Sequence, residues 1–131
     1  MRRRTFLLST AALIPSISFA YPAETFSPAV WSNLRATNQT VVMNYRASWS
    51  LTCQIKAELI AEALAENPAY DQLTFVDVDW DTFGRSQLTE RLKVTRRSTL
   101  LVMKNGTEVA RLENEPYAHK VRALLDTALA A

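Results

Sequence analysis

Hydrophobic residues form three continuous runs along the chain, separated by segments in which they recur at helical spacing. The runs cover residues 40–45, 73–78 and 99–103 and are rich in Val, Leu and other residues that favour strands. Such runs are typical of strands covered on both faces of a sheet. Asn105-Gly106 predicts a tight hairpin that leads into a fourth strand over residues 107–112.

Helices are predicted between these strands. Ser27 and Ser50 are each suited to start a helix, and Pro68 stops the long helix that begins at Ser50. Residues 85–92 are predicted as a short helix, and Glu115 opens the last helix. The order α-β-α-β-α-β-β-α predicts an α/β fold in which helices join parallel strands and the closing hairpin adds an antiparallel edge.

The first 20 residues predict a secretory signal. Arg2, Arg3 and Arg4 precede a mostly apolar run that is too short to span a bilayer as a helix. The run ends in Ser18-Phe19-Ala20, with small residues at the positions that a signal peptidase reads. Two arginines followed by Thr-Phe-Leu also resemble a twin-arginine export signal. Three parts are therefore predicted: a cleaved signal over 1–20, a linker with a short helix over 21–39, and a folded domain over 40–131.

Signal cleavage changes the charge balance. It removes three Arg and no acidic residue, which leaves 12 Lys and Arg against 13 Asp and Glu. The whole-chain charge of +2 therefore gives no support to nucleic-acid binding, and no membrane association is expected after cleavage. Cys53 is the only cysteine, so it is a buried inert thiol, a reactive thiol or an intermolecular partner.

Three sequence blocks, in this order, resemble the thioredoxin family. "VVMNYRASWSLTCQ" is similar to the family's strand and W-C-G-P-C active site, "FVDVDWD" to the next strand, and "LKVTRRSTLLVMKNGTEVARL" to the segment with the cis-proline and the hairpin. The resemblance implies a thioredoxin-like three-layer α/β/α sandwich with a central mixed sheet. It also implies a site at the start of the long helix, with substrate docking at Arg46, Arg97, Ser98 and Thr99.

Three functional positions of the family are altered together, while the flanking Trp49 is retained. Ser50 replaces the attacking cysteine, Asn44 the buried aspartate, and Ser98 the cis-proline. A hydroxyl nucleophile needs a general base, and the single histidine, His119, lies in the last predicted helix. Ser50 is therefore better explained as a helix N-cap. The peptide bond before Ser98 is expected to be trans, because a non-proline cis bond costs about 2.5–4 kcal/mol.

Cys53 leaves two alternatives open. It is a shielded structural thiol, or its thiolate is favoured by the helix N-terminus and by nearby cations. The cations are Arg46, Lys56, Arg96 and Arg97. They could also attract an anionic partner such as a glutathione carboxylate, although such side chains are more often simply solvated.

No metal or cofactor is expected. Asp77, Asp79 and Asp81 alternate, and carboxylates at this spacing could bind Ca²⁺. They are better explained as a strand end and a loop, with Asp81 or Thr82 as a helix cap. One cysteine and one histidine are too few ligands for zinc.

These observations predict an exported thioredoxin-like protein of thiol-redox homeostasis in the bacterial periplasm. Dithiol–disulfide exchange needs an attacking and a resolving thiol, so the protein is expected to be impaired as an oxidoreductase. Its single thiol, Cys53, would form mixed disulfides with glutathione or protein thiols. The alternative is a non-catalytic thioredoxin-fold binding or chaperone module. The partner and the oligomeric state are left open.

Overall fold

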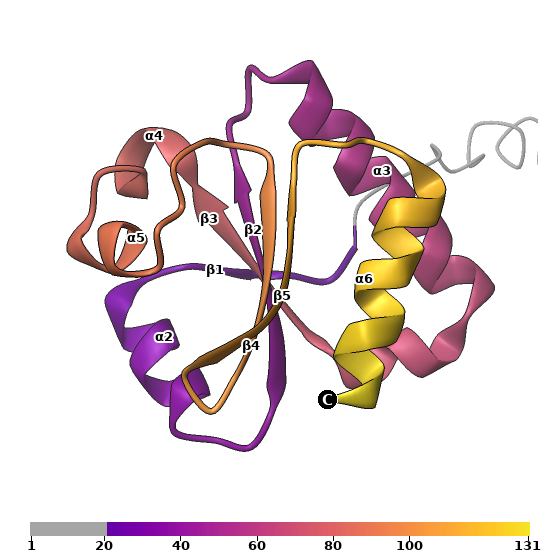
Figure 1. Cartoon of the computed structure of the whole chain (residues 1–131), viewed down its shortest axis with the longest axis horizontal. Coiled ribbons are helices and arrows are strands. Elements are labelled where there is room, and N and C mark those ends of the chain that lie inside the picture. The colour runs from indigo at the N-terminus through magenta and orange to yellow at the C-terminus, as the bar shows by residue number, and fades with distance from the viewer. Residues whose placement is uncertain (1–20) are drawn as a thin grey trace, which may run out of the picture.

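A computed structural model describes residues 21–131, and the predicted signal lies outside the described residues. Five strands form one sheet in the order β1-β3-β2-β4-β5 (Figure 1). Their bounds in chain order are Glu24–Thr25, Thr40–Arg46, Thr74–Asp79, Thr99–Lys104 and Thr107–Glu113. The helices are α2 (Pro28–Arg35), α3 (Leu51–Glu66), α4 (Trp80–Phe83), α5 (Gln87–Arg91) and α6 (Ala118–Ala130), with a 3₁₀ turn, η1, at Pro68–Gln72.

The sheet separates two hydrophobic cores. Alternate residues of β2 point to opposite faces, so Val42 packs in one core while Val41 and Met43 pack in the other. The first core lies under α3 and α6, and the second lies under α2, α4 and α5 (Figure 1). This arrangement confirms the predicted three-layer α/β/α sandwich.

The predicted parallel pairing is correct for one pair of central strands and wrong for the other. β2 and β3 are parallel and are joined by the long helix α3, whereas β4 pairs with β2 in the antiparallel sense. After β3 the chain forms only the short helices α4 and α5, and it re-enters the sheet beside the end of β2, where Thr99 pairs with Tyr45. Without a long crossover helix, β4 must run back along the sheet.

Three smaller differences concern element ends. Residues 21–39, expected to be a linker and a short helix, also contribute the edge strand β1, which pairs with β3. Helix α4 follows β3 directly, where a loop was expected, and α6 begins at Ala118 instead of Glu115. Asn114 and Glu115 adopt positive φ angles, a conformation that no α-helix contains.

The hairpin prediction is confirmed. Asn105 and Gly106 join β4 to β5 with φ angles of 53° and 76°, the two positive values that a type I′ turn requires. None of the helices over residues 21–131 is long and apolar enough to cross a membrane.

Candidate functional site at the start of helix α3

Ser50 is the N-cap of α3, as the sequence predicts. Its backbone is extended, and its hydroxyl oxygen accepts a hydrogen bond from the Cys53 backbone N–H at 3.3 Å. The side chain is buried, and the serine uses its oxygen to satisfy one of the unpaired N–H groups of the first turn. This contact gives Ser50 a structural role at the start of α3.

Cys53 lies one turn into the helix and is only 1 % exposed. Its sulfur accepts a hydrogen bond from the Ala47 backbone N–H at 3.5 Å. A thiol must reach the sulfur of an incoming disulfide in order to react with it. The geometry therefore fits the alternative of a shielded thiol better than that of an open nucleophile.

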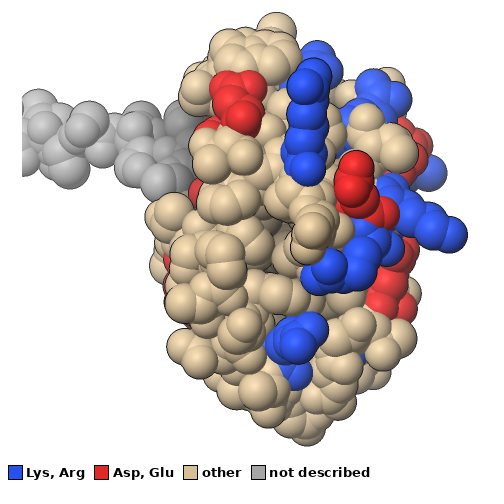
Figure 2. Space-filling view, turned by 90° about the vertical axis from the view of Figure 1, so that its left-hand side faces the viewer, with Lys and Arg blue, Asp and Glu red and all other residues tan. Residues whose placement is uncertain are grey.

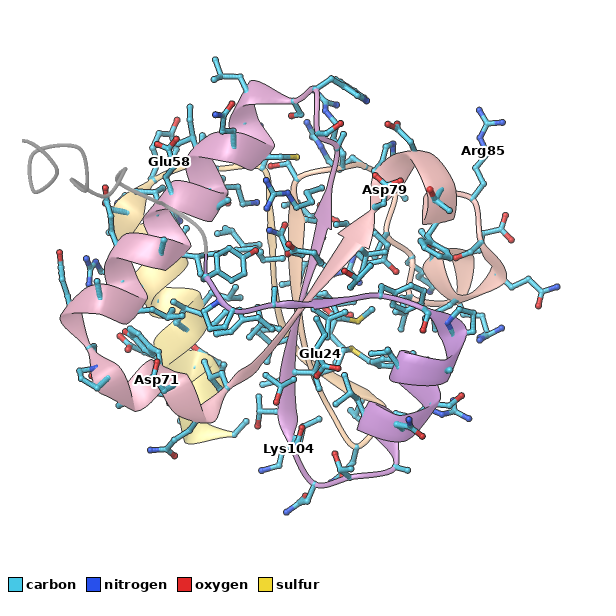
Figure 3. The ribbon with its side chains drawn as sticks, turned by 180° about the vertical axis from the view of Figure 1, so that it is seen from behind. Glu24, Glu58, Asp71, Asp79, Arg85 and Lys104 are labelled. Carbon is cyan, nitrogen blue, oxygen red and sulfur yellow. The ribbon has the colours of Figure 1, made fainter. Side chains whose placement is uncertain are left out.

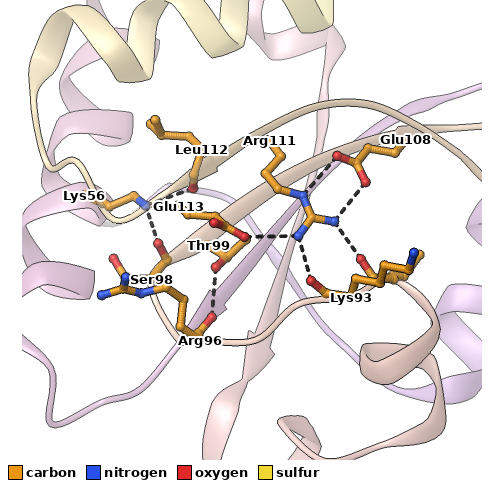
Figure 4. Close-up of polar contacts among 10 residues, drawn as sticks. Lys56, Lys93, Arg96, Ser98, Thr99, Glu108, Arg111, Leu112 and Glu113 are labelled. Atoms are coloured by element: carbon orange, nitrogen blue, oxygen red, sulfur yellow. Dashed lines mark hydrogen bonds and ion pairs between the residues drawn. The ribbon is translucent and has the colours of Figure 1, made fainter.

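Lys56 is fully buried one turn beyond Cys53, on the same face of α3. Its ammonium donates hydrogen bonds to the carbonyl oxygens of Ser98 at 2.6 Å and Leu112 at 3.4 Å (Figure 4). Desolvation by burial lowers the pKa of Lys56 to about 8, against the opposing effect of the nearby Cys53. The sequence pattern predicts Lys56 to be one of several solvated cations near Cys53, and its internal position corrects that prediction.

The loop before β4 is fixed by backbone hydrogen bonds around Ser98. The Arg97–Ser98 peptide bond is trans, which confirms the prediction, and Ser98 has a φ of 62°. Its N–H donates to the Tyr45 carbonyl at 2.7 Å, and its own carbonyl accepts from Asn114 N–H as well as from Lys56. These contacts hold a left-handed conformation that is uncommon outside glycine. Its buried hydroxyl has no hydrogen-bond partner within residues 21–131.

Trp49 and Leu51 form an exposed apolar rim on either side of Ser50, with 62 % and 69 % of their surface accessible. The Arg97 guanidinium carbon lies 4.9 Å from the centre of the Trp49 ring, within cation–π distance. The indole N–H of Trp49 donates to both carboxylate oxygens of Asp81 at 3.1 Å. Two side chains from distant segments thus orient an aromatic ring that stays open to solvent.

Polar side chains of β2 and β3 form ion pairs and hydrogen bonds with one another and with Tyr21. Arg46 lies 3.6 Å from the carboxylate of Asp77, and Tyr21 donates to the same carboxylate at 2.8 Å. The amide of Asn44 donates to the Tyr21 hydroxyl at 2.7 Å, while its oxygen has no partner in the described part of the chain. Burial, together with the Asp77 charge, raises the pKa of Tyr21 well above its usual range. Arg46 therefore has a carboxylate partner of its own.

The remaining predicted residues lie close to this site or elsewhere. Thr99 donates its hydroxyl to the Arg96 carbonyl at 2.8 Å and so stabilises the Ser98 loop (Figure 4). The Arg96 side chain is exposed, and His119 lies in α6. Tyr21 is not among the predicted site residues, and Asp81 is predicted only as a calcium ligand or a helix cap. The sequence gives no signal for their contacts with Asp77, Asn44 and Trp49, because these partners are far away along the chain.

The acidic residues at the end of β3 and in α4 are engaged in other contacts. Asp77 pairs with Tyr21 and Arg46, and Asp81 holds Trp49. Asp79 is the N-cap of α4 and accepts a hydrogen bond from the Thr82 N–H at 3.2 Å, so the predicted cap at Asp81 or Thr82 is wrong. Over residues 21–131 no three His, Cys, Asp or Glu side chains are grouped as metal ligands.

Comparison with known proteins agrees with the fold. The thioredoxin family model matches residues 22–127. Thioredoxin-1 of Saccharomyces cerevisiae is 34 % identical over 77 residues, which cover 59 % of this chain and 70 % of the yeast protein. The crystal structure of Trxlp from Edwardsiella tarda superposes with a TM-score of 0.67 at 27 % identity, covering 80 % of this chain and 96 % of the other.

A thioredoxin of Plasmodium falciparum is also similar. Its structure gives a TM-score of 0.66 at 25 % identity and covers 79 % of this chain and 97 % of the other. The chain belongs to the thioredoxin family of redox proteins.

Proposed function

We propose that this thioredoxin-family protein is a non-catalytic binding module that uses the rim of its former redox site to hold exposed protein segments. The observation that carries this proposal is the contrast between the oriented, exposed ring of Trp49 and the buried thiol of Cys53. An exposed aromatic beside an aliphatic side chain suits contact with an apolar segment, because such residues supply most of the binding energy at interfaces. Thiol exchange needs an accessible sulfur, which the site does not offer.

The partner chemistry follows from the same rim. Trp49 and Leu51 offer apolar contact, while Arg97 supplies a cation beside the ring. An extended segment with an aromatic or aliphatic side chain could lie against the ring. Unfolded and reduced proteins expose such segments.

An insulin aggregation assay separates binding from catalysis. When a small dithiol reduces insulin, the released B chain aggregates and scatters light. An oxidoreductase speeds the onset of scattering, whereas a binding module delays or lowers it. We expect the protein to lower the scattering in proportion to its concentration. Earlier scattering than with the dithiol alone would contradict the proposal.

Variants of the rim locate the binding surface. The double substitution Trp49→Ala and Leu51→Ser is expected to remove most of the effect on scattering, with a change in stability within about 0.5 kcal/mol because both side chains are exposed. The matched control is Val109→Ser, which alters an exposed apolar side chain toward the hairpin end of β5. The rim is not the binding surface if the control loses as much activity as the double variant.

A mixed-disulfide role for Cys53 is the second candidate. The observation in its favour is the buried ammonium of Lys56, which lies one turn away from Cys53 on the same face of α3. Glutathione or a protein thiol would then be the partner. This role requires the sulfur to react with a disulfide in the folded protein, and lack of such reaction would exclude it.

We also propose, on sequence grounds, that the protein is exported to the bacterial periplasm. The basic start, the apolar run and the small residues ending at Ala20 support this proposal. The expected result is a processed protein that begins at Tyr21 in a periplasmic fraction. Replacing Arg3 and Arg4 with lysine distinguishes the two export routes. It should block export by the twin-arginine pathway and leave export by the general secretory (Sec) pathway active. An unprocessed protein that stays in the cytoplasm would contradict export.

A further inference from the structure

A groove lies between α2 and α5, on the side of the sheet opposite α3. Its volume is about 390 Å³, and the side chains of Phe26, Trp31 and Phe83 contribute to its lining. Phe26 and Phe83 pack edge to face with ring centroids 4.8 Å apart, so the aromatic wall is held in place. A groove of this size can accept a small organic molecule.

The charged residues that line the groove are both arginines. Arg35 extends from the last turn of α2 and Arg91 from the last turn of α5, and no Asp or Glu lines the groove. Neither arginine forms an ion pair or a side-chain hydrogen bond within residues 21–131. Figure 2 views the side of the molecule that carries α2, α4 and α5, and shows basic and acidic side chains beside a broad uncharged area.

A favourable interaction with the helix dipole accounts for one arginine at the end of each helix. It does not account for two arginines that line one aromatic groove and have no carboxylate partner within residues 21–131. The Trp31 indole N–H is buried beside the groove without an acceptor in the described part of the chain. That nitrogen has no exposed surface, so a ligand would reach it only after the wall rearranged. The groove as it stands therefore offers two cationic side chains and an apolar lining.

We propose that this groove binds a small amphipathic carboxylate. The apolar ring or chain of the ligand would lie against Phe26 and Phe83, and its carboxylate would be held by Arg35 and Arg91. A guanidinium offers paired N–H groups that match the two oxygens of a carboxylate. This inference goes beyond the proposed function, because the groove residues are distinct from the Trp49 rim and neither site requires the other.

Titration with 3-phenylpropionate tests the proposal on the purified protein. Two-dimensional NMR follows the indole N–H signals, and a Trp31→Phe variant identifies the signal of Trp31. The expected result is a saturable shift of that signal, with affinity that falls as salt is added. The neutral isostere 3-phenylpropionamide should bind about tenfold more weakly, since it lacks the charge that the arginines recognise.

Variants that remove the arginine charges test whether the ligand binds in this groove. Arg35→Gln combined with Arg91→Gln should weaken binding of 3-phenylpropionate about tenfold. The control is Arg85→Gln, because Arg85 does not line this groove and its side chain points away from the body of the molecule (Figure 3). Equal affinity for the acid and the amide, an equal loss in the Arg85 variant, or no shift of the Trp31 signal would overturn the proposal.

Discussion

Replacing Ser50 with cysteine is expected to turn the protein into a dithiol oxidoreductase. The Ser50 hydroxyl lies 3.3 Å from the Cys53 N–H, so a thiol at this position would be adjacent to Cys53 in the first turn of α3. The helix N-terminus lowers the pKa of a thiol placed there and favours the attacking thiolate. In the oxidised variant both thiols should be lost to an internal disulfide, detected by mass and by thiol counting.

The insulin assay measures the gain in activity. The Ser50→Cys protein should bring scattering forward, with a reduction rate at least about tenfold above that of the small dithiol alone. Ser50→Ala is the matched control, because it removes the cap at a cost of about 1 kcal/mol and adds no thiol. A wild-type protein that reduces insulin as fast as the Ser50→Cys variant would show that a second thiol is not what the site lacks.

Stability should rise with pH between about 8 and 10 because of Lys56. Burial lowers its folded-state pKa from 10.5 to about 8, so in this window the folded protein releases a proton that the unfolded chain retains. The unfolded state then binds more protons, and the free energy of unfolding increases by up to about 1.4 kcal/mol per pH unit. Above pH 10 the tyrosines oppose this trend, since burial raises the folded-state pKa values of Tyr21, Tyr45 and Tyr70.

Denaturant unfolding at pH 7, 8, 9 and 10 measures this effect. In the Lys56→Met variant the rise should disappear, because the titrating group is gone. Lys120→Met is the control, since Lys120 is an exposed residue of α6 whose ion pair with Glu115 lies at the surface. The assignment to Lys56 fails if the Lys56→Met protein keeps the same increase as the wild type.

The three altered family positions form one consistent site. Asn44 replaces a titratable acid with an amide that donates to Tyr21, and Ser50 caps α3. Ser98 keeps a trans bond and is held by hydrogen bonds to Tyr45, Asn114 and Lys56. Each residue has a structural partner, and within residues 21–131 the one thiol, that of Cys53, is buried. The pattern supports a site that retains its shape for binding.

The fold was predictable wherever local sequence determines structure. The N-cap at Ser50, the hairpin at Asn105 and the buried runs of β2, β3 and β4 all follow from short patterns of residues. The direction of β4 was not predictable in this way, because it depends on where the chain lies after α5. The strand β1 has only two residues and is too short to give a periodic pattern.

The site was predictable in its residue types and not in their environments. Sequence alone places Cys53 at the start of a helix, but its exposure depends on how Ala47 and its neighbours pack over the sulfur. The burial of Lys56 depends on carbonyl groups contributed by Ser98 and Leu112, which lie 42 and 56 residues away along the chain. Asp81 holds Trp49 from 32 residues away. No short pattern encodes such contacts.

The reactivity of Cys53 tests the central claim most directly. The chain has a single cysteine, so any thiol signal from the purified protein belongs to this residue. The measurement is the reaction with 2,2′-dithiodipyridine at pH 7, followed by the release of thiopyridone, in buffer and in denaturant. The account predicts almost no release from the folded protein and one equivalent per chain after unfolding. Release from the folded protein at the rate of a free exposed thiol would contradict it.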